Sequence, residues 1–491
     1  MSLQIFLHGK ILGIEEFLLA SPPAGEGGSG ETALAVRSHW VSLLSEVLPR
    51  AMLSELGLAK ILLGSSGGGE FLVVLPQEAR PKAEEFLTAA AADVAGLSGG
   101  RLSLVWAITE NLGDWSVVRR RINDQFSAYT SSPLASGIDG TFLARVAPPI
   151  EPSGSTEDYF TAELLDGFRH SEVCGWNPER PGIILPAAGK HSWSLSPGVE
   201  SISLARHAAP SDDGLTGADL VTLASRAQGR QCWGVLRGDV DNFGIRFRRA
   251  QSIEEHVSLS VIIKQFFAGE LEVVCSMPEF WRRVTILYSG SDDFAVYGAW
   301  DSLILLAREV QRLFHRLSEE TMRELPGPEG KTISMALAVA PETDAGLAAV
   351  YRDAGRKLEI AKASGKDCFY LLGRTLEWKQ IAEAQELKER MARMVTEFGC
   401  STQFLSELAS FYRDTTVLPG AGRSRWQEKR FERPWRFYRR LNRLLAGSRD
   451  REFQRVRTNL IGELIGKGSS QRKLRPAGRV ALEWARLTTE E

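Results

Sequence analysis

The spacing of hydrophobic and polar positions changes along this chain and predicts an ordered series of strands and helices. Residues 3–8 read as a strand, and residues 33–56 place apolar side chains at helical spacing. A hairpin with a glycine-rich tip over 61–75, a helix over 81–96 and a strand over 102–109 follow. This order predicts a ferredoxin-like unit.

The same order recurs in the second half of the chain, which indicates an internal repeat. A helix and a short strand then extend the second copy. The predicted elements are a strand at 233–239, a helix at 253–275, a hairpin at 284–297, a helix at 301–324, a strand at 333–339, a helix at 345–364 and a strand at 368–372.

The segments outside the repeats differ from them in pattern. The stretch between the repeats is rich in Pro, Gly and Ser and shows one helical segment, at 217–227, whereas the pattern after the second repeat is helical to the end. We therefore predict an α+β fold of four parts. They are a first ferredoxin-like (palm) domain at 1–146, an irregular linker domain at 147–230, a second palm domain at 231–376 and an all-α C-terminal domain at 377–491.

Acidic residues stand at two strand ends of the second repeat. Asp239 closes the strand at 233–239, and Asp292 and Asp293 lie at the tip of the hairpin. If the hairpin pairs beside that strand, the carboxylates converge at one edge of a sheet. Such oxygen ligands suit Mg²⁺, and two ions about 3.5–4 Å apart support phosphoryl chemistry. The alternative is structural, because Asp is also a common turn and capping residue.

Aligning the two repeats indicates that only one carries this acidic cluster. Gly69 falls opposite Asp292, and Lys10 falls near the position of Asp239. The first repeat therefore cannot hold metal ions in the same way, and we interpret it as a platform for the second.

Charge is distributed unevenly over the 491 residues. The formal net charge is −2, but residues 421–487 hold 19 Lys/Arg and 6 Asp/Glu, a net of +13 that leaves −15 elsewhere. Such a block is either a solvated helix face or a surface for RNA or a partner protein. The aromatic residues within it are core residues or stacking platforms. The arginines that we expect to contact RNA or a partner are Arg436, Arg439, Arg440 and Arg443.

Apolar runs and cysteines indicate where in the cell the protein is expected. No apolar run approaches the roughly 18 residues that span a bilayer, and charged residues interrupt the N-terminal segment, so neither an anchor nor a signal peptide is expected. The five cysteines lie far apart without a CxxC pair. This spacing predicts a reducing cytoplasm and no zinc site.

Several short motifs occur in one order that is typical of a known family. The strongest are Gly238-Asp-Val-Asp-Asn-Phe-Gly244 and Tyr288-Ser-Gly-Ser-Asp-Asp-Phe294, the second matching a GGDD turn. Weaker motifs lie at 13–17, 36–38, 67–71, 354–367 and 372–378. Over nearly its whole length the chain resembles the large polymerase/cyclase-like subunit of type III CRISPR effector complexes, in the Csm-type branch.

The resemblance implies synthesis of cyclic oligoadenylate from ATP, with two Mg²⁺ or Mn²⁺ ions, when the complex binds target RNA. Implied partners are guide RNA, target RNA and the backbone, small and guide-capping subunits, with no membrane. Ser260, Lys362 and Lys366, to which the resemblance gives nucleotide contacts, also fit ordinary solvated positions on a helix surface or at a helix end. The implied roles are metal binding and catalysis by Asp239, Asp292 and Asp293, a further metal ligand from the Val240 carbonyl, and nucleotide contacts from Ser260, Gly290, Ser291, Lys362 and Lys366.

Three departures from the family pattern change these expectations. The chain contains no His-Asp dipeptide, so cleavage of single-stranded DNA by an HD-type nuclease domain is not expected. Cys174 alone cannot supply the zinc ligands that relatives often carry between the palms. Ser291 replaces the second glycine of the turn and would be strained if φ were positive there. Two alternatives therefore stay open, an RNA-binding scaffold subunit and a free-standing nucleotidyl cyclase.

Overall fold

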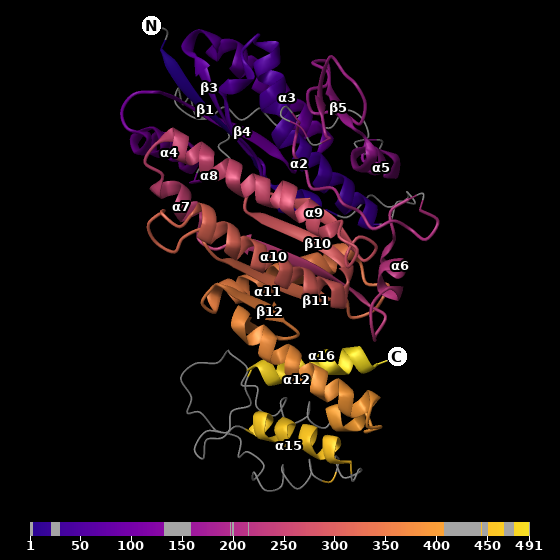
Figure 1. The fold of residues 1–491 in the computed structure, drawn as a ribbon. Coiled ribbons are helices and arrows are strands. Elements are labelled where there is room, and N and C mark those ends of the chain that lie inside the picture. The colour runs from indigo at the N-terminus through magenta and orange to yellow at the C-terminus, as the bar shows by residue number, and fades with distance from the viewer. Residues whose placement is uncertain are drawn as a thin grey trace.

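The computed structural model describes most of the chain, and the following account is restricted to that part. The described residues are 3–20, 30–131, 159–196, 198, 201–214, 216–406, 443, 450–465 and 476–490, with the side chains of 128–131 and 461–476 excluded. The first palm, the second palm and the C-terminal helices follow one another along the long axis of the molecule (Figure 1).

The first palm is a four-stranded antiparallel sheet of order β2-β3-β1-β4, the ferredoxin-like order that the sequence predicts. One face packs against the long helix α2, and the other packs against α4 through Phe6, Val105 and Trp115. The elements are β1 (Gln4–Leu12), α1 (Ile14–Leu18), α2 (Gly30–Glu55), β2 (Leu63–Gly67), β3 (Glu70–Pro76), α3 (Arg80–Leu97), β4 (Ser103–Glu110) and α4 (Trp115–Ser131).

The second palm repeats this order and extends it to six strands, β13-β12-β11-β8-β10-β9. The predicted strands and the hairpin are confirmed, but the helix expected over 253–275 contains a π-helical turn at Phe266–Glu270. The short helix α7 and the strand β13 were not predicted. The elements are β8 (Trp233–Val240), α7 (Phe243–Arg249), α8 (Ile253–Gln265), α9 (Leu271–Cys275), β9 (Val284–Ser289), β10 (Asp293–Ala299), α10 (Trp300–Thr321), β11 (Ile333–Val339), α11 (Leu347–Ala363), β12 (Cys368–Leu371) and β13 (Arg374–Glu377).

The two palms share one hydrophobic core. Trp40 of α2 and Tyr297 of β10 are buried in the same cluster, whereas a separate core covers the other face of the second sheet. Arg119 of α4 donates to the carbonyl oxygens of Phe247 (2.7 Å) and Ala250 (3.1 Å) at the end of α7. The palms are therefore held together by apolar packing and by charge-assisted hydrogen bonds.

The linker is more ordered than its sequence pattern indicates. It contains a helix and a three-stranded antiparallel sheet of order β6-β5-β7, neither of which was predicted, and the expected helix at 217–227 is shorter. Cys174 is fully buried in β5, while His170 is exposed and pairs with Asp166. The elements are α5 (Ala162–His170), β5 (Val173–Trp176), β6 (Ile184–Leu185), β7 (His191–Ser194) and α6 (Leu220–Ser225).

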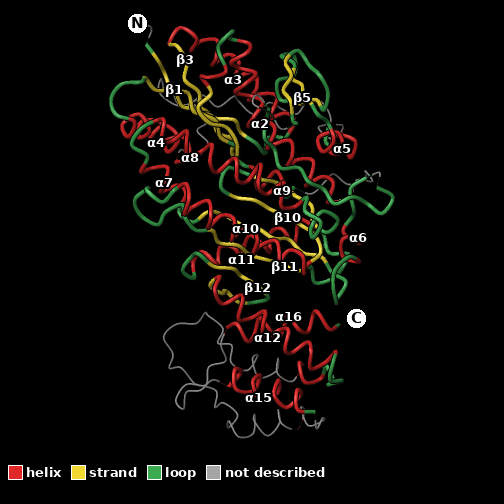
Figure 2. The backbone as a smooth tube through the Cα atoms, viewed as in Figure 1, coloured by secondary structure: helices red, strands yellow, loops and turns green. Residues whose placement is uncertain are grey.

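The described residues after the second palm are mainly helical, which confirms the predicted fold class. The helices α12 (Trp378–Thr396) and α16 (Pro476–Thr489) pack against each other, and α15 (Arg451–Ile465) contacts α12 (Figure 2). No helix among the described residues is long and apolar enough to cross a membrane.

Candidate active site

The three predicted acids lie together at one edge of the second palm sheet. Asp239 is the penultimate residue of β8, and the antiparallel register places it directly opposite Asp293 of β10. Paired residues of an antiparallel ladder point to the same face, so these two carboxylates lie on one side of the sheet. The backbone N–H of Val240 donates to the carbonyl oxygen of Asp292 (2.9 Å), which fixes the turn beside the end of β8.

The site favours the neutral form of its acids. Burial, together with the neighbouring carboxylates, raises the pKa of Asp292 to about 7. Burial also raises the pKa of Asp239 to about 6, although its contact with Lys362 opposes the shift. The pKa of Asp293 is raised by burial as well. Like charges held this close create a demand for a cation.

A tyrosine contacts Asp293, and an arginine contacts that tyrosine. The Tyr288 hydroxyl donates to Asp293 Oδ2 (2.9 Å) and accepts from Arg237 Nη2 (3.4 Å). The Arg237 guanidinium also lies 4.3 Å from the centroid of the Tyr351 ring. A Cβ on Gly290 would lie 2.1 Å from Asp293 Oδ1, so a side chain at this position would displace the Asp293 carboxylate. Arg237, Tyr288 and Tyr351 were not predicted from the sequence as part of the site.

Ser291 does not adopt the strained conformation that its place in the turn led us to consider. The non-glycine residues with positive φ are elsewhere, so the expected strain at Ser291 is not present. Its hydroxyl donates to Asp292 Oδ1 (3.0 Å). The serine therefore orients the neighbouring carboxylate at no cost in backbone strain.

The two predicted lysines come from the end of α11 and from the loop after it. Lys362 Nζ lies 2.9 Å from Asp239 Oδ2, so it is not an isolated solvated helix end. Lys366, with φ of 66°, contacts Asn242 Oδ1, and Asn242 itself has φ of 59°. Both ammonium groups thus lie beside the end of β8, where the acids converge.

Asp241 belongs to the same motif but has a structural role. It is 2% exposed and accepts from Thr332 Oγ1 (2.8 Å), Ser334 Oγ (2.8 Å) and the Asp367 N–H (2.9 Å). These donors join β8, β11 and the loop before β12. Asp241 therefore fixes the loop that carries Lys366, whereas Asp239 two residues earlier faces the site.

The structure gives less information on the remaining predicted residues. Ser260 is half-buried on α8, one turn before Lys264, and its role stays a prediction. Arg443 is helical and exposed, and Arg436, Arg439 and Arg440 lie outside the described residues.

The first palm carries an ion pair where the second palm carries two acids. Its register pairs Gly9 with Phe71 and Lys10 with Glu70, as Gly238 pairs with Phe294 and Asp239 with Asp293. Lys10 Nζ lies 2.7 Å from Glu70, and His8 contacts the same carboxylate at 3.2 Å. The lysine supplies an internal cation, which agrees with the interpretation of the first palm as a platform.

The donor set of the second palm fits a divalent cation completed by substrate. Among the described residues, no group of three or more His, Cys, Asp or Glu side chains is placed to hold a metal ion unaided. Mg²⁺ usually takes one or two carboxylates and fills its other positions with water and phosphate oxygens. Asp239 and Asp292 are the residues that could hold such an ion, with the Val240 backbone next to them.

Comparison with known proteins agrees with this fold and site. Residues 232–370 match the family model described as the second palm domain of Cas10/Cmr2. Two curated relatives are both named CRISPR system single-strand-specific deoxyribonuclease Cas10/Csm1 (subtype III-A). The relative from Enterococcus italicus is 28% identical over 179 residues, covering 35% of this chain and 22% of its own length, and the one from Mycobacterium tuberculosis is 28% identical over 178 residues, covering 32% and 21%.

Solved structures extend the similarity over the whole chain at the level of the fold. A Csm1–Csm4 cassette without ligand gives a TM-score of 0.71 at 16% identity, covering 99% of this chain and 70% of the other. Csm1 of T. onnurineus gives 0.69 at 16% identity, covering 100% and 70%. A Csm1–Csm4 cassette in complex with cA4 gives 0.67 at 17% identity, covering 99% and 70%.

The second palm, with its acidic turn, is therefore similar to the second palm domain of Cas10/Cmr2. The curated relatives carry the name Cas10/Csm1, and the similar solved structures contain Csm1. The matched segment spans about a fifth of the curated relatives' length, at 22% and 21%.

Proposed function

We propose that this chain is the large subunit of a type III CRISPR effector complex and joins ATP into cyclic oligoadenylate when target RNA binds. The observation that carries the proposal is the convergence of Asp239, Asp292 and Asp293 beside Lys362. Support comes from the match to the Cas10/Cmr2 second palm and from the likeness to Csm1–Csm4 cassettes in complex with AMPPNP and cA4.

In the proposed mechanism the chain mainly positions the substrate and neutralises the charge of its phosphates. Asp239 and Asp292 would hold Mg²⁺ or Mn²⁺, which supplies activation of a 3′-hydroxyl and stabilisation of the pyrophosphate leaving group. Lys362 and Lys366 attract the triphosphate, and Lys362 moves from Asp239 to a phosphate oxygen as substrate binds. Ser291 holds Asp292, and Tyr288 holds Asp293, so the acids need little reorganisation.

The proposal extends to partners. A Csm4-type subunit, guide RNA and target RNA would bind the chain, with the basic C-terminal block as one contact surface. One of the similar structures is a Csm1–Csm4 subcomplex in the type III-A CRISPR-Csm interference complex. The proposal does not include the deoxyribonuclease activity in the relatives' names, because it rests on the residues of the palm site alone.

The test combines the assembled complex, cognate target RNA, ATP and Mg²⁺ or Mn²⁺, with products identified by mass spectrometry. We expect cyclic oligoadenylate from the wild type and a loss of about 100-fold or more in Asp292→Ala, because a site that works by charge neutralisation loses its central ligand. Asp353→Asn, which changes an acid on α11 paired with Lys357 outside the site, serves as the matched control and should keep full activity.

Two other results would overturn the proposal. RNA binding without any nucleotide product from the wild-type complex would favour the scaffold alternative. Product formation by the isolated chain without RNA would favour a free-standing cyclase.

A further inference from the structure

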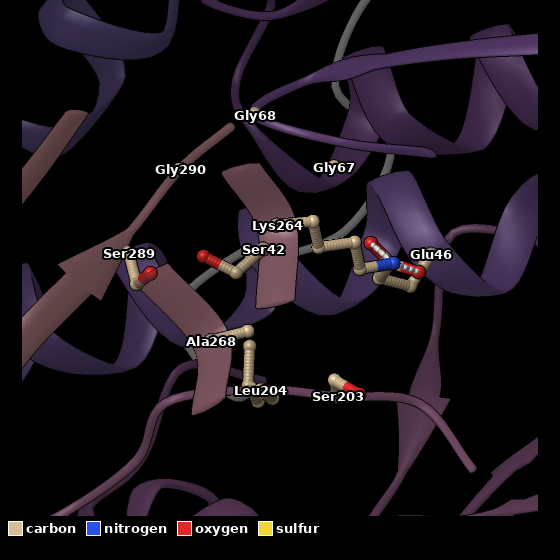
Figure 3. Close-up of a pocket in the computed structure, with 10 residues that line it drawn as sticks. All are labelled: Ser42, Glu46, Gly67, Gly68, Ser203, Leu204, Lys264, Ala268, Ser289 and Gly290. Atoms are coloured by element: carbon tan, nitrogen blue, oxygen red, sulfur yellow. Dashed lines mark hydrogen bonds and ion pairs between the residues drawn. The ribbon is translucent and has the colours of Figure 1, made fainter. Parts of the chain in front are cut away.

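A buried carboxylate lies in the palm interface next to the active site. Glu46 of α2 has a side chain that is 3% exposed and pairs with Arg50 Nη1 at 2.7 Å. It accepts from Ser66 Oγ at 2.8 Å and from Lys264 Nζ at 2.6 Å. Glu46, Arg50 and Ser66 belong to the first palm, whereas Lys264 belongs to α8 of the second. Figure 3 shows the Glu46–Lys264 pair, which crosses from one palm to the other.

The glycine tip of the first palm lies between this carboxylate and the acidic turn. Gly67, Gly68 and Gly69 follow Ser66 and have φ values of 124°, 61° and 80°. A Cβ on Gly67 would lie 3.2 Å from Glu46 Oε1, and a Cβ on Gly68 would lie 2.8 Å from Ser291 Oγ. The tip therefore touches the Glu46 network on one side and the turn of the second palm on the other.

A small pocket lies between the Glu46 network and the acidic turn. The pocket is bordered by Glu46, Lys264 and the tip, and also by Ser289 and Gly290 of the second palm. The close-up in Figure 3 shows the chain at Gly290 running toward the tip at Gly68. The contact between Gly68 and Ser291 thus supports the turn that carries Asp292.

We propose that Glu46 and Lys264 are positioning residues that hold the glycine tip against Ser291 and so fix the orientation of Asp292. Neither residue touches the carboxylates of the active site, and their effect passes through Ser66, Gly68 and Ser291. The effect on turnover rests on the proposed function, whereas the effect on the order of the turn does not. A buried ion pair gives one defined geometry to an interface, since its separation leaves a charge without a partner.

The test uses Lys264→Met in the full chain assembled with its complex. This change removes the link between the palms but leaves Glu46 paired with Arg50 and Ser66. Hydrogen exchange of the peptide spanning 288–294 should become about tenfold faster, since local opening controls exchange. The kcat for ATP should fall about 10- to 100-fold with little change in KM, because small displacements of a catalytic group have effects of this size. Lys264→Arg should restore both values.

Arg283→Met is the matched control. Arg283 also forms a half-buried ion pair, 2.7 Å from Asp301, but it lies at the opposite end of β9 from the acidic turn. It should lower the thermal stability without changing exchange at 288–294 or kcat. Ser66→Ala keeps both ions and removes the hydroxyl next to the tip, so it should reproduce part of the Lys264→Met effect.

The outcomes are distinguishable. Exchange at 288–294 that stays at the wild-type rate in Lys264→Met and Ser66→Ala, or that rises equally in Arg283→Met, overturns the positioning role. A wild-type complex that makes no product overturns the proposed function instead, and the exchange rates still decide the role of Glu46 and Lys264.

Discussion

Asp292 and Asp239 show how burial and charge prepare single residues for a cation. Their pKa values of about 7 and about 6 mean that, without metal, protons occupy these acids well above the usual range of aspartate. The folded chain therefore binds more protons than the unfolded chain between about pH 4 and pH 7. Stability that comes from this protonation is lost as the pH rises through that window.

The first consequence concerns stability without metal. Asp292→Asn removes the repulsion but keeps a side-chain oxygen for Ser291, so at pH 7.5 in chelator the variant should be more stable than the wild type. We expect about 1–3 kcal/mol, less than the roughly 4 kcal/mol that three pKa units represent, because the neighbouring acids titrate together. Thermal unfolding at pH 7.5 and pH 4.5 measures the difference, which should shrink at the lower pH.

A variant that is less stable than the wild type at both pH values would contradict this electrostatic account. Addition of Mn²⁺ should reverse the order at pH 7.5, since the ion binds the native wild type and its binding free energy adds to stability.

At the scale of elements, the two palms use one packing device at the same place in each sheet. Gly9 of β1 faces the Phe71 ring, and Gly238 of β8 faces the Phe294 ring, with a Cβ on either glycine 2.2 Å from a ring carbon. Each glycine precedes the residue that defines its site, Lys10 or Asp239. The motifs therefore include glycine because an aromatic ring of the hairpin occupies the space of a side chain.

The pair provides a matched experiment. Gly9→Ala and Gly238→Ala should each destabilise the chain by about 1–3 kcal/mol, because a methyl group is forced into a filled core. Only Gly238→Ala should weaken Mn²⁺ binding, since it displaces the strand that presents Asp239. Calorimetric titration with Mn²⁺ measures the difference, and equal loss of affinity in both variants would place the metal elsewhere.

The elements that sequence reasoning found are those with long, regular patterns. Strand β8 and the β9–β10 hairpin were predicted because apolar runs end in acidic turns. Strand β13 was missed because Leu372, with φ of 45°, and Gly373 form the two-residue loop of a hairpin. Leucine is not a typical turn residue, so the sequence does not indicate this loop. The linker sheet was missed because its strands are two to four residues long.

The site was predicted only in part for a related reason. Acidic residues at strand ends are visible in the sequence, whereas contacts across long separations are not. The Lys362–Asp239 contact and the donors that surround Asp241 join segments about a hundred residues apart, and no local pattern reports them. The basic block with Arg436 stays a prediction.

At the scale of the whole molecule, the last helix completes the core of the second palm. Val480, Leu482 and Trp484 of α16 are buried in the cluster that also contains Leu236 of β8. The Leu487 carbonyl accepts from the Arg230 N–H (2.7 Å), just before β8 begins. The C-terminal helix is therefore part of the structure that supports the acidic sheet edge.

A large effect on stability follows. Trp484→Ala should destabilise the chain by about 3–5 kcal/mol, the usual cost of removing a buried aromatic side chain. Thermal unfolding and Mn²⁺ titration of the same sample check it. An exposed position on the same half of the molecule, Arg312 on α10, provides the control, because Arg312→Ala removes only a surface ion pair with Glu309. An unchanged melting temperature in Trp484→Ala would show that α16 is not needed for the core.

Lys10 makes the two palms different in charge at corresponding positions of their sheets. Lys10 is part of the chain, so the first palm keeps its cation when a chelator removes free divalent ions, whereas protons and Lys362 alone then offset the carboxylates of the second palm. Two halves with nearly the same backbone would thus repel or accept a polyanion differently according to the supply of free divalent ions. An anionic ligand would thus meet a fixed ion pair in one palm and, in the other, carboxylates whose charge depends on the ions bound to them.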